Sequence, residues 1–355
     1  MKLGIVGLPA CGKTTVFNAL TGADLPTGAL SPTQEIHTAV VDVPDPRVDR
    51  LSQLFNPKKT IYAKVTYADI AGLTADAGSA GIPGQLLNQI QQMDGLVQVV
   101  RAFEDPSVPH TKESVDALRD FQDMESEFLL NDMVTVERRL EKLREEHDRG
   151  GRDRAVVARE ISLFERLGTR LSSEQPLRGM EISSEENKLL AGFGLLTRQP
   201  MLVIVNLGEG QPCPEFGDVG PGVQVLPLQG KLEMEIAQLP PEEARTFLDE
   251  YGIDEAGRSR VIQASYDLLG LMSFFTVGED EVRAWTVGRK ATAIEAAGTI
   301  HSDLARGFIR AEVIGWQELL DLGGLAQARS EGKLRIEGKD YPVQDGEVVH
   351  IRFNI

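Results

Sequence analysis

Residues 7–14 read Gly-Leu-Pro-Ala-Cys-Gly-Lys-Thr, a full match to the pattern G-x-x-x-x-G-K-[ST] of phosphate-binding loops. The apolar residues 3–6 before the loop predict a buried strand, and residues 15–20 after it predict the first turns of a helix. In such a unit, glycines let backbone N–H groups turn toward phosphate oxygens, and the helix N-terminus adds positive potential. A glycine-rich surface turn is the alternative, but the flanking elements favour nucleotide binding.

Two kinds of role are expected inside this loop. Lys13 is predicted to reach the β- and γ-phosphates and to act in catalysis, and the Thr14 hydroxyl is predicted to bind Mg²⁺. The residues predicted to bind the phosphates are Pro9, Ala10, Cys11, Gly12, Lys13, Thr14 and Thr15. Cys11 is interpreted as a small apolar filler rather than an oxidation-sensitive thiol.

A second nucleotide-binding signal, D-x-x-G, stands at residues 69–72, about 55 residues after the loop. Asp69 is expected to hold Mg²⁺ through water, and the Gly72 N–H is expected to face the γ-phosphate. Thr33 is the candidate second Mg²⁺ ligand, although a simple turn residue explains it equally well.

Composition excludes several classes of protein. The 355 residues are enough for about two domains. No stretch approaches 18 consecutive apolar residues and no secretory signal precedes residue 2, so neither a membrane span nor export is expected. Two cysteines, Cys11 and Cys213, cannot form a disulfide framework, which fits a reducing cytoplasm. The net charge of −17 argues against a general nucleic-acid coat.

The order of predicted elements indicates an α/β fold with a mostly parallel sheet. The expected strands are residues 2–6, 38–43, 61–69, 96–103, 201–206 and 222–228. Residues 114–196 interrupt this rhythm: apolar side chains at 129, 133, 136, 140 and 143 follow a helical spacing, Gly150-Gly151 predicts a turn, and a second helical stripe follows. We therefore expect residues 1–270 to form a P-loop domain that contains a helical coiled-coil hairpin at about 114–196. Residues 271–355 are expected to form a small mixed domain.

The base-recognition signal follows the fifth strand of the predicted sheet, at residues 206–209, which read Asn-Leu-Gly-Glu. Guanine-specific enzymes of this class carry Asn-Lys-x-Asp here, with the aspartate accepting hydrogen bonds from guanine. Asn206 can still bond adenine N6 and N7, and Leu207 can cover the base. With Glu209 in place of aspartate, the sequence favours ATP over GTP. Gln229 and Gly230 occupy the last base-contacting loop.

Catalysis lacks one expected group. Ras-like enzymes carry a glutamine after D-x-x-G that orients the attacking water, whereas this chain carries Leu73. We therefore expect either a low basal rate of hydrolysis or a group supplied by a partner that orients the water. His110, in a proline-rich loop after the fourth strand, is a candidate catalytic residue, and an exposed loop histidine is the simpler interpretation.

The chain resembles the YchF family of Obg-like P-loop nucleotidases over nearly its whole length. The matching stretches are residues 7–15, 43–47, 69–73, 206–209, 281–285, 296–303, 307–312 and 338–341. The resemblance implies a C-terminal TGS domain with a ubiquitin-like β-grasp, ATPase activity with weaker use of GTP, ribosome association and a role in stress responses. It also implies a monomer, RNA contact through the C-terminal domain, and a catalytic role for a loop histidine at the place of His110.

One departure from the family pattern lies inside the phosphate loop. Relatives usually carry Asn-Val where this chain has Ala10-Cys11, and that asparagine can help to bind a monovalent cation. Since Ala10 offers no side-chain oxygen, potassium stimulation by that route is not expected. The main prediction is a cytoplasmic, Mg²⁺-dependent ATPase switch. A GTP-specific enzyme of ribosome assembly and a ribosome-binding adaptor with little hydrolysis are the alternatives.

Overall fold

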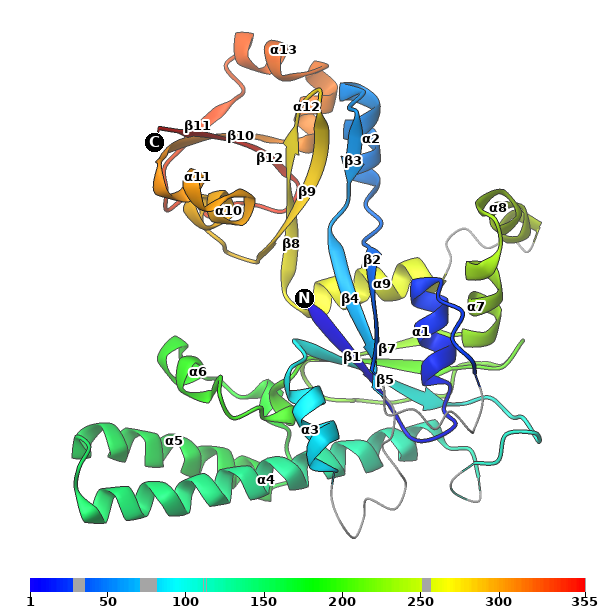
Figure 1. Ribbon diagram of the computed structural model, residues 1–355, viewed down its shortest axis with the longest axis vertical. Coiled ribbons are helices and arrows are strands. Elements are labelled where there is room, and N and C mark those ends of the chain that lie inside the picture. Colours follow the sequence, from blue (N-terminus) through cyan, green and yellow to red (C-terminus); the bar gives the residue numbers. More distant parts are fainter. Residues whose placement is uncertain (28–35, 71–81, 111, 113, 251–256, 355) are drawn as a thin grey trace. The chain divides into compact units, whose positions relative to one another are not determined.

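The structure, a computed structural model, describes residues 1–27, 36–70, 82–110, 112, 114–250 and 257–354. By compactness the chain divides into two units (Figure 1). The first unit comprises residues 1–39 and 66–261, and the second comprises residues 40–65 and 262–355. Thr33, Gly72 and Leu73 lie outside the described residues.

The first unit is built on a six-stranded sheet in the order β2-β4-β1-β5-β6-β7. The pairs β4–β1, β1–β5, β5–β6 and β6–β7 are parallel, which confirms the predicted parallel α/β sheet. Its strands are β1 (Lys2–Val6), β2 (His37–Asp42), β4 (Lys64–Asp69), β5 (Gly95–Arg101), β6 (Met201–Asn206) and β7 (Val223–Leu228).

Helices cover both faces of this sheet. On one face, α3 and α4 bury Ile90, Phe121 and Phe128 against the apolar residues of β1, β5 and β6. Elsewhere in the unit, α1 lies beside α7 (Figure 1). The helices of the unit are α1 (Lys13–Thr21), α3 (Gly84–Gln91), α4 (Ala117–Arg149), α5 (Arg154–Ser172), η2 (Leu177–Gly179), α6 (Ser184–Leu190), η3 (Leu196–Arg198), α7 (Gly230–Gln238), α8 (Pro241–Glu250) and the first part of α9 (Gly257–Leu268).

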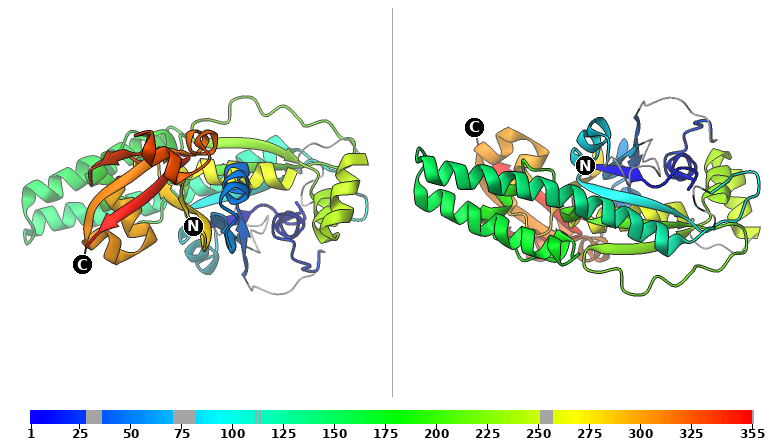
Figure 2. Two further views of the ribbon diagram at one scale, coloured as in Figure 1. Left: turned by 90° about the horizontal axis from the view of Figure 1, so that it is seen from above. Right: turned by 90° about the horizontal axis from the view of Figure 1, so that it is seen from below.

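The predicted hairpin is formed by α4 and α5, which run side by side and which we call the arm (Figure 2). The apolar stripe expected on residues 129–143 faces the second stripe, with Val136 and Leu143 buried against Val157, Phe164 and others of α5. The turn falls at Gly150-Gly151, as predicted. Burial of these two stripes against each other is what holds two otherwise polar helices together.

The base of the arm is fixed to the sheet by polar contacts of α4. The Asp132 carboxylate accepts hydrogen bonds from the backbone N–H groups of Leu196 and Thr197, both at 2.8 Å, and from the Thr197 hydroxyl at 2.7 Å. Nearby, Arg178 forms a two-bond ion pair with Glu125 of α4. Asp132 thus satisfies the first N–H groups of η3, and η3 is followed by β6, so α4 is tied to the strand that carries Asn206.

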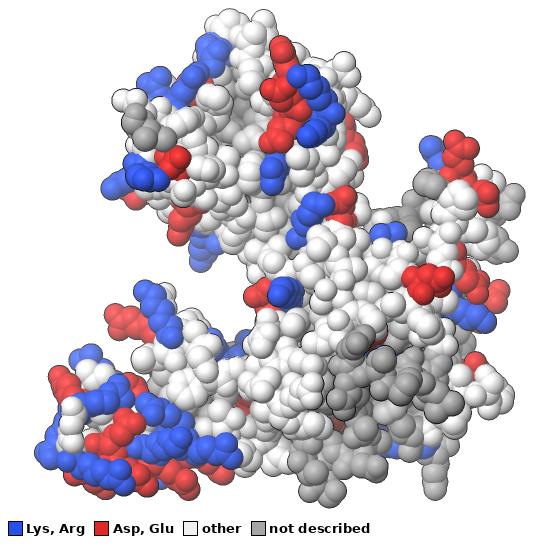
Figure 3. Space-filling view, in the orientation of Figure 1, with Lys and Arg blue, Asp and Glu red and all other residues white. Residues whose placement is uncertain are grey.

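Arginines crowd the free end of the arm, and the structure pairs many of them with glutamates. Arg139 and Arg152 both bind Glu160, and Arg144 binds Glu165. Figure 3 shows basic and acidic side chains mixed over this part of the surface. Mixed charges of this kind are typical of a solvated helix surface, which agrees with the prediction, from the net charge, that the chain is not a general nucleic-acid coat.

The second unit is a mixed sheet in the order β11-β10-β12-β8-β9-β3. Strands β8 and β12 are parallel neighbours, while β8–β9, β10–β12 and β10–β11 are antiparallel, and α10 packs on the sheet. This arrangement confirms the predicted β-grasp. Its elements are α2 (Pro46–Phe55), β3 (Lys59–Ile61), β8 (Leu271–Val277), β9 (Glu281–Gly288), α10 (Ala293–Ile300), α11 (Ser302–Arg306), β10 (Phe308–Gly315), α12 (Trp316–Leu322), α13 (Leu325–Ser330), β11 (Arg335–Glu337) and β12 (Glu347–Phe353).

The stretch 61–69, predicted as one strand, is two. Ile61 ends β3, which pairs in parallel with β9, and Lys64 begins β4 of the other sheet. Apolar β-forming residues run through the whole stretch, so their pattern could not reveal the change of sheet at Tyr62-Ala63. Among the described helices, not one combines the length and apolarity needed to cross a bilayer.

Candidate functional site

The loop between β1 and α1 has the conformation that a phosphate cradle requires. Gly12 has φ 95°, and a Cβ built on it would lie 2.2 Å from the Asn206 side-chain nitrogen. A Cβ on Gly7 would lie 2.5 Å from the Val99 carbonyl oxygen. Only glycine fits at these two close approaches. Gly12 is also the N-cap of α1 and makes no side-chain cap, so a ligand can take the free N–H groups of the first turn.

The Lys13 ammonium lies over the loop. Its Nζ donates to the backbone carbonyls of Gly7 at 3.1 Å and Leu8 at 2.9 Å. A lysine held across the loop in this way places one positive charge beside the N-terminus of α1. The other residues predicted to bind phosphate are Pro9, Ala10 and Thr15, which are half-buried.

Thr14 and Asp69 meet, although 55 residues separate them in the chain. The Thr14 hydroxyl donates to Asp69 Oδ2 at 2.8 Å. Asp69 Oδ1 is buried and has no hydrogen-bond partner among the described residues. Burial raises the pKa of Asp69, against the opposing effects of the Thr14 hydrogen bond and the Lys13 charge. Burying a carboxylate oxygen without a partner costs free energy unless a cation or a water binds it. Thr14 and Asp69 together therefore offer the oxygen ligands that a hard metal ion such as Mg²⁺ prefers.

Asn206 joins three parts of the site. Its amide nitrogen donates to the Cys11 carbonyl at 3.0 Å, and its amide oxygen accepts from the Gly230 N–H at 3.1 Å. An asparagine amide has two N–H donors, and one of them is used by Cys11. The structure therefore brings the end of β6, the phosphate loop and the start of α7 together, and it leaves one amide hydrogen of Asn206 for a base.

The other residues predicted to contact the base differ in their exposure to solvent. Leu207 is buried, with its N–H bonded to the Leu228 carbonyl at 2.9 Å, whereas Glu209 is exposed. Gln229 is half-buried and is the N-cap of α7. Gly208, between Leu207 and Glu209, donates its N–H to the Gln211 side-chain oxygen at 2.8 Å.

Cys11 is buried inside the loop, and both Cys11 and Cys213 are free thiols. Burial raises the pKa of the Cys11 thiol, with Lys13 lowering it and Asp120 raising it further. A thiol held in its protonated form reacts slowly with oxidants. The geometry therefore favours the filler interpretation of Cys11.

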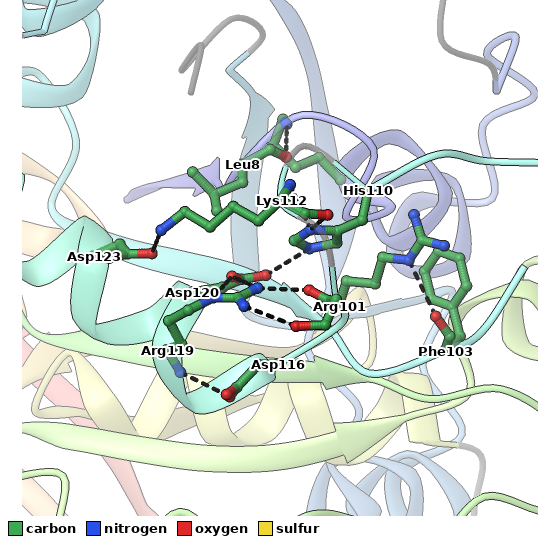
Figure 4. A network of polar contacts seen from close by, with 11 residues as sticks. Leu8, Arg101, Phe103, His110, Lys112, Asp116, Arg119, Asp120 and Asp123 are labelled. Atoms are coloured by element: carbon green, nitrogen blue, oxygen red, sulfur yellow. Dashed lines mark hydrogen bonds and ion pairs between the residues drawn. The ribbon is translucent and has the colours of Figure 1, made fainter. Parts of the chain in front are cut away.

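His110 is not the exposed loop residue that the simpler interpretation expected. Its imidazole side chain is 7 % exposed, and Nε2 lies 2.9 Å from Asp120 Oδ2 in the first turn of α4 (Figure 4). Nδ1 accepts a hydrogen bond from the Lys112 N–H at 3.0 Å. The loop spacing could not predict this partner, because Asp120 belongs to the inserted helix.

Sequence reasoning also missed Arg101 and Phe103. Arg101 ends β5 and is 2 % exposed; its Nε donates to the Phe103 carbonyl at 3.1 Å, and its guanidinium stacks 4.4 Å from the Phe103 ring centre. A Cβ built on Gly208 would lie 3.5 Å from Phe103 Cβ. Phe103 therefore packs beside the base-recognition stretch. An arginine at the end of an apolar run gives no signal that it will be buried.

A phosphate cradle, a Thr–Asp pair beside it and an asparagine at the end of a neighbouring parallel strand define the class: this is a P-loop nucleoside triphosphatase. A family profile described as 50S ribosome-binding GTPase matches residues 2–137, and the YchF-GTPase_C profile, described as a protein of unknown function, matches residues 271–354. The chain belongs to the YchF family.

Three comparisons support this membership over the full length. The chain is 40% identical to the ribosome-binding ATPase YchF of Bacillus subtilis, covering 100% of both chains. It is 39% identical to the protein of the same name from Haemophilus ducreyi, covering 100% of this chain and 99% of that one. The solved structure of the Schizosaccharomyces pombe YchF GTPase is similar with a TM-score of 0.86 at 32% identity, covering 99% of this chain and 97% of that one.

Proposed function

We propose that this enzyme prefers ATP and acts at the ribosome. The observation that carries the base preference is the Asn-Leu-Gly-Glu stretch at residues 206–209, with Asn206 held by one hydrogen bond to the phosphate loop and one from the start of α7. The name of the Bacillus subtilis and Haemophilus ducreyi relatives, ribosome-binding ATPase, supports both parts of the proposal.

Base discrimination follows from the chemistry of residues 207 and 209. Guanine offers N1 and N2 donors that an aspartate in Asn-Lys-x-Asp can accept, and adenine has no N1 proton. Here Glu209 is exposed and one methylene longer, while Leu207 is buried beside the end of β6. The site therefore lacks the acidic clamp for guanine and keeps one Asn206 donor for an adenine acceptor.

The phosphates would be bound by the loop amides and by Lys13, whose ammonium already lies over the loop. Thr14 Oγ1 and, through water, Asp69 would hold Mg²⁺, and the unpartnered buried Oδ1 of Asp69 fits this role. Bound Mg²⁺ neutralises charge on the β- and γ-phosphates. Thr33 and the Gly72 N–H are proposed as further contacts, and His110 as the group that assists the attacking water in place of the absent glutamine.

A swap toward the guanine-specific motif tests the base preference. We expect wild-type protein to bind ATP more tightly than GTP, and the double variant L207K/E209D to shift the ratio of the two dissociation constants toward GTP by at least about 10-fold, the effect of one good base contact. E209Q is the matched control and should leave the ratio unchanged. A wild-type preference for GTP would favour the GTP-specific alternative.

Ribosome titration tests the adaptor alternative. Single-turnover ATP hydrolysis should be slow without ribosomes and faster with them. A negligible rate under both conditions, with ribosome binding intact, would favour an adaptor that uses nucleotide only for structure.

The remaining parts of the proposal concern the whole chain. We propose a P-loop domain at 1–270 and a TGS-type domain at 271–355, the latter making RNA contact, in a cytoplasmic monomer. The parallel β8–β12 pair and the profile match to 271–354 support the C-terminal boundary. The ribosome-binding names of the relatives support the location.

A further inference from the structure

Both ring nitrogens of His110 are occupied in this structure. Nδ1 lies 3.0 Å from the Lys112 backbone nitrogen and 3.2 Å from the Lys112 carbonyl oxygen. Nε2 lies 2.9 Å from Asp120 Oδ2, and because a carboxylate only accepts, a neutral ring carries its proton on Nε2 and accepts the Lys112 N–H at Nδ1. With this tautomer neither nitrogen has a free lone pair or a free proton. In this position the imidazole can neither accept a proton from a water nor orient one.

The carboxylate that holds His110 is itself firmly placed. Asp120 is 3 % exposed at its side chain, and its other oxygen accepts two hydrogen bonds from Arg119, at 2.9 and 3.2 Å. Arg119 in turn donates to the Ser114 carbonyl at 2.7 Å. Figure 4 shows Arg119 and His110 both directed at the Asp120 carboxylate. A buried acceptor with both oxygens bonded forms a strong and specific contact.

The charge of Asp120 contributes to raising the pKa of the buried Cys11 thiol, which lies in the phosphate loop directly before Gly12. Asp120 also stands in the first turn of α4, four residues after the Asp116 N-cap. The group that holds His110 therefore belongs to the arm, while His110 belongs to the loop that follows β5.

We propose that Asp120 is a positioning residue that stores His110 away from the nucleotide, and that release of the imidazole from Asp120 controls the rate of hydrolysis. This inference rests on the proposed role of His110. A competent state that is only partly populated lowers the observed rate by its fraction, so weakening the storage contact raises the rate. Because Asp120 is on α4, a partner that moves the base of the arm would change that fraction.

Single-turnover hydrolysis of ATP by the full chain tests the proposal with D120N. Asparagine keeps the shape and an acceptor oxygen but removes the charge, so the contact weakens and the rate should rise about 10-fold. In an H110A background, D120N should have no effect. E137Q is the matched control: Glu137 lies on the same helix and is exposed, so the loss of its charge should leave the rate unchanged.

The outcomes separate the two hypotheses. If H110A alone hydrolyses ATP as fast as wild type, the proposed catalytic role of His110 fails. If H110A is slow but D120N is as slow as H110A, Asp120 supports the active position and the storage proposal fails. An unchanged rate in D120N, with H110A slow, also overturns storage.

A second measurement uses the unaltered protein and so does not depend on folding of a variant. Nitrogen-15 NMR of the histidine rings should show His110 as the Nε2–H tautomer with a slowly exchanging proton. H110A identifies the signal among the five histidines of the chain. In the complex with a non-hydrolysable ATP analogue and Mg²⁺ the signal should persist and its proton should exchange faster, because the ring leaves Asp120 in only a fraction of the molecules. An exchange rate as slow in the analogue complex as in the free protein would overturn the proposal.

Discussion

Asp132 and Asp69 are both buried carboxylates of the first unit, and burial raises the pKa of each, yet their surroundings differ. Asp132 accepts three hydrogen bonds where α4 meets η3, two of them from backbone N–H groups. Asp69 accepts one from Thr14 and keeps a bare buried oxygen. A satisfied buried carboxylate is part of the framework, whereas an unsatisfied one identifies a place where a ligand belongs.

The largest expected effect is on the framework carboxylate. Replacing Asp132 by alanine leaves the N–H groups of Leu196 and Thr197 and the Thr197 hydroxyl buried without an acceptor. We expect the free energy of unfolding to fall by about 3 kcal/mol, from the cost of buried unsatisfied donors. Urea denaturation followed by circular dichroism measures it. ATP affinity of the folded fraction should be unchanged, and a variant as stable as wild type would break the comparison.

At Asp69 we expect the opposite result, a loss of ligand binding rather than a loss of stability. In D69N the affinity for Mg²⁺ in the presence of ATP should fall by about 10- to 100-fold, the usual effect of losing a group that holds a metal through water. Titration of Mg²⁺ against hydrolysis or against a fluorescent nucleotide measures the shift. Binding of nucleotide without metal is the control and should change little. An unaltered Mg²⁺ dependence would remove Asp69 from the metal site.

The pH dependence of the stability of D69N, measured without ligand, gives a further test of the difference between Asp69 and Asp132. A carboxyl whose pKa is raised above the ordinary 3.8 is harder to ionise in the folded chain, so the stability present at low pH is lost as pH rises. D69N carries no charge at any pH. It should therefore be more stable than wild type at pH 7, by about 1 kcal/mol, and the gain should shrink as pH falls toward 4. Thermal melts across this range would contradict the account if the gain grew with acidity.

The smallest effect is expected at an exposed ion pair of the arm. Arg144 and Glu165 lie 3.1 Å apart with both side chains more than half exposed. R144A should change the free energy of unfolding by about 0.5 kcal/mol or less, because water screens such pairs. The same denaturation assay as for D132A gives the value. A loss as large as that of D132A would mean that exposure is a poor guide to the energetics of this helix pair.

The parts that the sequence predicted are those set by local pattern. Residues 2–6 and 201–206 match β1 and β6, and the stripe at 129–143 faces α5. Local pattern failed where tertiary partners decide. The stretch 61–69 divides between two sheets, and β10 was not predicted as a strand at all, because only its second half is buried.

The candidate site divides in the same way. The approach of Thr14 to Asp69 agrees with the order of the motifs, since Asp69 ends β4 and the loop that leads to Thr14 follows the parallel neighbouring strand β1. The contact of His110 with Asp120 and the burial of Arg101 could not be predicted. Both features depend on tertiary contacts between an inserted helix and a loop, and the hydrophobic periodicity of the sequence contains no signal for such contacts.

Ala10 has φ 59°, a left-handed backbone conformation that alanine adopts at a cost and asparagine tolerates well. The resemblance to the YchF family implies asparagine at this position. The backbone of the loop therefore already has the conformation in which asparagine would be less strained than Ala10. A10N should therefore fit without rearrangement and would add a side-chain oxygen to the phosphate loop.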